Sequence, residues 1–148
     1  MTACAGPLPC ARIPLDVPGL THTTELAAGA LRTCAIAAAG VLCWGVDQSQ
    51  PVPVTLPTAV HDLVAGAGVF CALTLPPAGQ AYCWGSGSPP APVDQGSLRF
   101  TALAAGYIHQ CGLTDQAHIY GWGDNAAGEL GTGDSTSSAT PVAVAPPS

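Results

Sequence analysis

Cysteine is the residue type in this 148-residue sequence whose number and spacing most clearly suggest chemistry. Of seven cysteines, four fall into two pairs, Cys34 with Cys43 and Cys71 with Cys83, and each pair brackets a glycine-containing turn sequence. Cysteine pairs form disulfides or, together with histidine, bind zinc. No C-x-x-C spacing occurs, and the histidines are isolated from one another: His22, His61, His109 and His118. We therefore predict structural disulfides and neither a metal site nor a cofactor.

The turn Ala38-Ala39-Gly40 predicts which cysteines face each other. Antiparallel pairing around it places residue 37 opposite residue 40, and therefore Cys34 opposite Cys43. Opposed Cα atoms in a non-hydrogen-bonded pair lie about 4.5 Å apart, within reach of a disulfide. The same reasoning gives Cys71–Cys83. Disulfides persist in oxidising compartments, so we expect a mature protein that is extracellular or on the cell surface, although the chain begins with no signal-peptide pattern.

Three further cysteines leave their pairing open. Cys111 occupies the position of Cys34 and Cys71, but glycine, Gly121, stands where its partner is expected. Cys4 and Cys10 could pair with each other, or one of them with Cys111. Either arrangement leaves one cysteine unpaired.

Candidate catalytic groups are sparse, and we predict that the chain is not an enzyme. His109 lies two residues before Cys111, so the two would share one face of a strand and form a base and a nucleophile on paper, but we do not expect a catalytic dyad. An acidic, glycine-rich segment suggests calcium, yet it lacks the alternating oxygen ligands of an EF-hand loop. We interpret it as a connecting turn; its candidate ligands are Asp124, Asn125, Glu129 and Asp134.

Charge and composition exclude several functions. The net charge is −6, lysine is absent, and three arginines, Arg12, Arg32 and Arg99, are scattered along the chain. Binding to nucleic acid or to an anionic membrane requires clustered cations, so neither partner is expected. Eighteen glycines and fifteen prolines exclude long helices. The composition therefore predicts short strands joined by tight turns.

The chain contains three copies of one repeat, which begin at Leu26, Leu63 and Leu103. Each copy has an Ala-Gly turn, a hairpin that ends in Trp-Gly, and a proline-flanked strand that belongs on a sheet edge because proline donates no hydrogen bond. Four short strands in about 40 residues are typical of a propeller blade. We expect the tryptophans to pack between blades. The repeated motif residues are Gly29, Gly66 and Gly106 with Trp44, Trp84 and Trp122.

The pattern A-G-x-x-x-x-C-A-L followed by Y-C-W-G resembles the repeat of the regulator of chromosome condensation family, especially its cysteine-containing bacterial extracellular versions. The segment from Trp122 to Val144 resembles the family's W-G-x-N-x-x-G-Q-L-G sequence, with Glu129 in place of Gln. The first two copies lack the Gly-Leu-Gly turn. The resemblance implies a β-propeller. The family's role in nuclear nucleotide exchange and chromatin binding does not fit a chain without a basic surface.

We therefore expect an all-β partial propeller of about three four-stranded antiparallel blades with disulfide-stapled hairpins. The predicted divisions are an N-terminal extension at 1–11, an outer strand of a preceding blade at 12–24, blade repeats at 25–61 and 62–101, and a third repeat with a C-terminal outer strand at 102–148. Outer-strand elements lie at both ends. Either the chain is an excerpt of a longer propeller, or copies associate through blade edges.

A scaffold without catalytic groups favours binding through its loops. We expect a non-enzymatic extracellular recognition or surface-assembly module whose partner is a protein or a second copy. One alternative is an inhibitor of a secreted enzyme, like the extracellular propeller that blocks β-lactamases. Another is a fragment of a larger propeller with hydrolase or lyase activity. The sequence identifies no ligand-binding residue.

Overall fold

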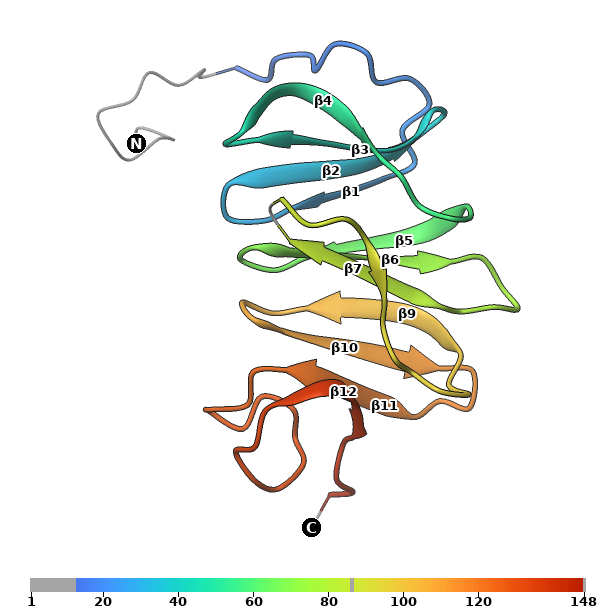
Figure 1. Ribbon diagram of the computed structural model, residues 1–148, viewed down its shortest axis with the longest axis vertical. Coiled ribbons are helices and arrows are strands. Elements are labelled where there is room, and N and C mark those ends of the chain that lie inside the picture. Colours follow the sequence, from blue (N-terminus) through green and yellow to red (C-terminus); the bar gives the residue numbers. More distant parts are fainter. Residues whose placement is uncertain (1–12, 86, 148) are drawn as a thin grey trace.

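Three four-stranded antiparallel sheets lie one above the next in the computed structural model, which describes residues 13–85 and 87–147 (Figure 1). Blade 1 contains β1 (Glu25–Ala28), β2 (Arg32–Ala37), β3 (Gly40–Gly45) and β4 (Gln48–Val54). Blade 2 contains β5 (Val60–Ala65), β6 (Val69–Thr74), β7 (Ala81–Gly85) and β8 (Ala91–Pro92). Blade 3 contains β9 (Phe100–Ala105), β10 (His109–Thr114), β11 (Ile119–Gly123) and β12 (Ser138–Ala143). No helix occurs in these ranges, so none is present there that could cross a membrane.

The strand order confirms the predicted fold class. In each sheet the strand before the Ala-Gly turn lies at one edge and the proline-containing strand at the other. The first hairpin has the predicted register, with Ala37 opposite Gly40 and Cys34 opposite Cys43, and Gly40 adopts a φ of 101°. β8 has only two residues, because the neighbouring prolines remove backbone donors from that edge.

The outer strand of a preceding blade that the sequence predicts at 12–24 is not observed, since residues 13–24 form no strand. An outer strand of a preceding blade pairs with a strand of that blade, and the described residues contain no such strand, because all twelve of their strands belong to blades 1 to 3. The segment instead leads into β1, and the Thr21 carbonyl accepts a hydrogen bond of 3.0 Å from the Ala38 amide. The predicted starts of the second and third repeats, at residues 62 and 102, also fall inside strands. β5 begins at Val60 and β9 at Phe100, so each strand starts before the register shift in its pairing with the next strand.

The Ala-Gly turns bring neighbouring blades close together. A Cβ on Gly66 would lie 2.5 Å from the Gly106 carbonyl oxygen, and a Cβ on Gly29 would lie 2.7 Å from the Gly66 carbonyl oxygen. A side chain at either position would collide with backbone of the next blade. Glycine is therefore required there by close approach, and the three turns stack at one end of the strands (Figure 1).

The core lies between the blades. Trp84 packs with Phe70 against Cys34 and Cys43 of blade 1, and its ring centroid is 6.1 Å from that of Phe70. In the same way, Trp122 packs against blade 2 and stacks on Phe100 with centroids 5.5 Å apart. Both tryptophans are thus buried between blades, as expected. Trp44 is half-buried because alternation along β3 turns it away from blade 2, toward a side where the described residues form no blade.

Candidate functional site

The turns at the Ala-Gly end of the stack form a rim that contains residues 29–31, 46–47, 66–68, 106–108 and 124–137. We call this surface the Ala-Gly rim; its turns lie on the left of Figure 1. Each of these segments directly follows a strand of one of the three blades. The Ala67 amide donates a hydrogen bond of 2.8 Å to the Tyr107 carbonyl oxygen, so the turns of blades 2 and 3 are joined directly. The rim is therefore a continuous part of the rigid scaffold.

Large apolar side chains project from this rim into solvent. Tyr107 is 73% exposed and Leu31 69% exposed, both in turns that follow the Ala-Gly glycine. Val46 and Ile108 are 62% and 48% exposed. At the opposite rim Leu75, at 48%, follows the end of β6. Exposed aromatic and aliphatic side chains on a rigid surface are typical of protein contact sites.

The charge on the Ala-Gly rim is negative. Arg32 donates to Asp47 at 2.7 Å, so the arginine of this rim is already paired. The long loop 124–137 adds Asp124, Glu129 and Asp134. A hydrogen bond from the Thr136 amide, and then one from the Thr132 hydroxyl, lower the pKa of Asp134 below its usual value. Its carboxylate therefore stays ionised at neutral pH.

The side chain of Asn125 fills the centre of loop 124–137. It is fully buried; its Oδ1 accepts from the Leu130 amide at 2.8 Å, and its Nδ2 donates to the Asp134 and Thr136 carbonyl oxygens at 3.1 Å each. One amide thus ties together both halves of the loop. The sequence places Asn125 in a connecting turn and in the W-G-x-N segment, directly after β11, but it does not indicate that the amide is buried at the centre of the loop.

Replacing Asn125 by alanine is expected to cost about 2–3 kcal/mol of unfolding free energy, because buried backbone groups of the loop lose their partners. Urea denaturation followed by tryptophan fluorescence measures the change. Ser135→Ala, in the same loop on an exposed residue, serves as the control and should alter stability by less than about 0.5 kcal/mol. Equal midpoints for the two variants would contradict the central role of Asn125.

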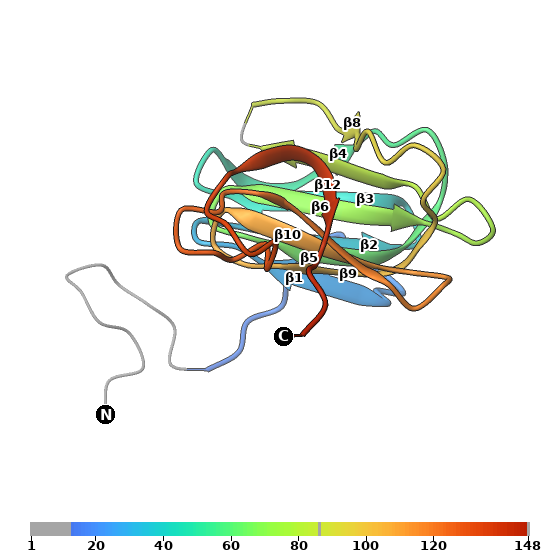
Figure 2. The ribbon, with the colours of Figure 1, turned by 90° about the horizontal axis from the view of Figure 1, so that it is seen from below.

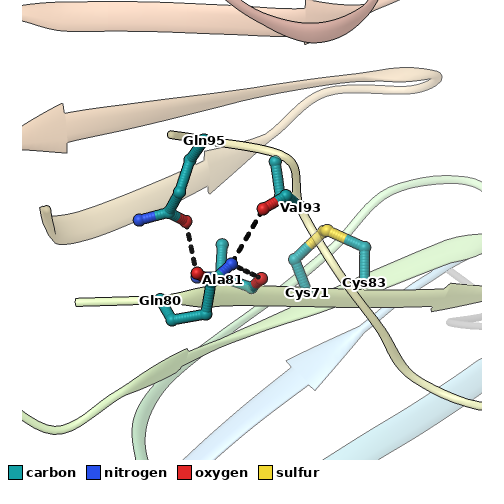
Figure 3. The surroundings of a disulfide bond; sticks show 6 residues. All are labelled: Cys71, Gln80, Ala81, Cys83, Val93 and Gln95. Carbon is teal, nitrogen blue, oxygen red and sulfur yellow. Dashed lines mark hydrogen bonds between the residues drawn. A yellow bond between two sulfur atoms is a disulfide. The ribbon is translucent and has the colours of Figure 1, made fainter. Parts of the chain in front are cut away.

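The two regular disulfides lie where the hairpin register places them. Cys34–Cys43 and Cys71–Cys83 have Cα–Cα distances of 4.1 Å. Beside the second bond, the segment after β8 is held against the start of β7: the Ala81 amide donates to Gln95 Oε1 at 2.9 Å, and Gln80 Nε2 donates to the Val93 carbonyl oxygen at 2.9 Å (Figure 3). The disulfides therefore hold the hairpins that carry the rim. Cys4 and Cys10, whose pairing the sequence leaves open, lie outside the described residues.

Cys111 is a free, half-buried cysteine opposite Gly121. The Leu130 side chain covers Gly121, where a Cβ would lie 3.1 Å from Leu130 Cδ2. Burial raises the pKa of the Cys111 thiol, so the thiol form dominates at neutral pH. An activated nucleophile requires the opposite shift, and the His109 ring lies over Gly106. The pair thus does not have the environment of a catalytic dyad. No cluster of metal-ligating side chains is found in residues 13–85 and 87–147.

No family model matches the sequence. Among solved structures, Prp20p from Saccharomyces cerevisiae superimposes with a TM-score of 0.76 and 17% identity, over 86% of this chain and 39% of its own. Human WBSCR16 gives 0.71 and 18%, over 86% and 40%. The ectodomain of the receptor kinase CR4 from Physcomitrella patens gives 0.57 and 23%, over 75% and 33%. The chain spans about two fifths of the first two proteins. Its three blades have the fold of the RCC1-type β-propeller.

Proposed function

We propose that this chain is a non-enzymatic recognition module that binds a protein partner through the Ala-Gly rim, outside the cytosol. The observation that carries the proposal is the exposure of Tyr107 and Leu31, at 73% and 69%, on turns that the stacked blades hold rigid. A rigid loop loses little conformational entropy on binding, and tyrosine is enriched at the energetically dominant positions of interfaces. The rim therefore has both the side chains and the preorganisation of a docking surface.

The chemistry of the rim indicates the kind of partner. Apolar side chains at its turns are flanked by the carboxylates of loop 124–137, while Arg32 is paired with Asp47. A complementary partner has an apolar patch bordered by lysine or arginine. Its association should slow as salt is added, because exposed charges are screened over about 8 Å at physiological ionic strength.

Two disulfides support an oxidising compartment. The neighbouring structures show that the same fold serves different settings, since Prp20p was studied for binding to Gsp1p and histones and CR4 is a receptor ectodomain. The partners of Prp20p are not transferred to this chain, because the identity is only 17% and the chain has a net charge of −6.

A photo-crosslinking residue at position 107 tests the proposal. The full chain carrying it is exposed to the secreted proteins of its source cells, with a matched probe at Leu75 on the opposite rim. We expect one protein to crosslink at position 107 and not at position 75. Tyr107→Ala should then weaken binding of that purified protein by about 30-fold, the equivalent of about 2 kcal/mol.

An unchanged dissociation constant for both Tyr107→Ala and Leu31→Ala would overturn the assignment of the rim. The inhibitor alternative has its own measurement, because a blocked β-lactamase loses hydrolytic activity when the chain is added in excess. A crosslinked partner that is an enzyme and loses activity on binding would make the chain an inhibitor acting through the same rim.

A further inference from the structure

A hollow of about 370 Å³ lies between the outer edges of blades 1 and 2. One wall is β4 of blade 1, with Val52 and Pro53, and the other is the connection from β7 to β8 of blade 2, with Pro89 and Pro90. In Figure 2, β4 and β8 lie on the upper side of the stack, away from β1 and β9. We call this space the interblade hollow. Its volume is within the range of roughly 300–1,000 Å³ that is typical of ligand pockets.

In blade 3, a leucine covers the position of the repeat that borders this hollow. Cys43 lines the hollow, and its counterpart in blade 3 is Gly121, since each precedes the Trp-Gly of its repeat. Leu130, from the long loop 124–137, is 1% exposed and packs over Gly121. In blade 1 only residues 46–47 connect β3 to β4, and they contain no leucine. The interblade hollow is therefore next to a position that accepts a leucine side chain elsewhere in the same chain.

Arg32 brings a cation to the hollow. It shares one face of β2 with Cys34, which packs toward blade 2, and its side chain lines the hollow. Nη2 donates to Asp47, but the buried Nε has no hydrogen-bond partner among the described residues. A buried donor without an acceptor is costly and indicates a missing partner. No acidic side chain is among the described residues that line the hollow, and a guanidinium binds a carboxylate through two parallel hydrogen bonds.

We propose that the interblade hollow binds the C-terminal residue of a polypeptide, with its carboxylate at Arg32 and an apolar side chain of leucine size between Cys43 and Val52. Charge complementarity selects the carboxylate, and the packing of leucine in blade 3 selects the side chain. An internal segment would bind as a strand added to β4, the edge strand of blade 1. Pro51 and Pro53 disfavour that arrangement because they donate no hydrogen bonds.

Nuclear magnetic resonance titration of the full chain with acetyl-alanyl-leucine tests the proposal. Trp84 lines the hollow, so its indole resonance should shift as this probe is added, while that of Trp122, between blades 2 and 3, should not. The C-terminal amide of the same probe has no charge and should bind at least tenfold more weakly. Acetyl-alanyl-alanine keeps the carboxylate but buries less apolar surface, and it should bind about tenfold more weakly.

Two variants locate the two halves of the site. Arg32→Gln should weaken binding of acetyl-alanyl-leucine at least tenfold and should abolish the preference for the acid over the amide, which a purely structural role of Arg32 would not change. Val52→Asp places a carboxylate on the wall at a residue that is 37% exposed, and it should weaken binding of the acid by a similar factor. Leu75→Asp, on an exposed leucine of the opposite rim, is the matched control and should bind as the unaltered chain does.

Equal affinity of the unaltered chain for the acid and the amide overturns the proposal, and this comparison requires no variant to fold. A dissociation constant that neither Arg32→Gln nor Val52→Asp changes also overturns it. Acetyl-leucyl-aspartic acid amide has its carboxylate on a side chain; if it binds as tightly as acetyl-alanyl-leucine, the assignment to a chain end is wrong. Tyr107 is not among the residues that line the hollow, so Tyr107→Ala should leave probe binding unchanged, and failure of the proposed function is distinguishable.

Discussion

Replacing Trp84 by alanine is expected to destabilise the fold by about 3–5 kcal/mol, the largest effect of any single substitution discussed for this protein. Its side chain is 6% exposed and fills the space between blades 1 and 2, where it stacks on Phe70 and packs in one buried cluster with Cys34 and Cys43. The surrounding side chains lie on paired strands, and Cys34 and Cys43 are also fixed by their disulfide, so the cluster collapses only partly into the cavity. Urea or thermal unfolding followed by circular dichroism measures the loss.

Trp44→Ala is the matched control. Trp44 occupies the same position of the repeat, but it is half-buried and lies on the side of blade 1 away from blade 2. Its removal should cost less than half as much as the removal of Trp84. Equal losses for the two variants would contradict the assignment of Trp84 to a core between blades.

Removing the Cys71–Cys83 disulfide by a double substitution with alanine is expected to cost about 3 kcal/mol. The bond joins residues 12 apart, and in the chain-entropy model its main effect is to restrict the unfolded chain. Cys71 is also 1% exposed, so two alanines leave unfilled volume where the bond packs between strands. Denaturation with and without a reducing agent provides the measurement.

The Cys34–Cys43 bond joins residues nine apart and should contribute nearly the same amount. Cys111→Ser is the control because Cys111 forms no disulfide in the structure, and its stability loss on reduction should match that of the unaltered chain. If reduction leaves the unfolding midpoint of the unaltered chain unchanged, the stabilising role of both bonds is wrong.

The hairpins show which contacts can be predicted from local sequence. A turn that ends in Gly40 and a side-chain period of two are enough to place Cys34 opposite Cys43, because each successive pair follows from the previous one. The N-terminal segment shows the limit. Ile13 to Leu20 has the composition of an outer strand, but backbone groups become a strand only beside a partner, and the described residues offer none.

The candidate site was less predictable than the fold. Tyr107 directly follows the repeated glycine and Leu31 lies two residues after it, but nothing in a repeat says whether an apolar residue in this turn is buried or exposed. Their exposure depends on how the turns stack, which is set by the contact between backbones at Gly66 and Gly106. Asn125 was likewise visible in the sequence, while its burial depends on a loop that folds around it.

The pairs Cys34–Cys43 and Cys71–Cys83 were determined by the sequence alone, together with the repeat and the blade, because these depend on contacts within a few residues of a turn. That Cys111 is free was decided only by the structure. Tertiary structure alone decided which faces of the blades are covered. Leu26 and Leu63 have the same place in the repeat, yet one is 62% exposed and the other 3%. The physical reason is that burial belongs to a pair of blades, and a repeat encodes only one member of each pair.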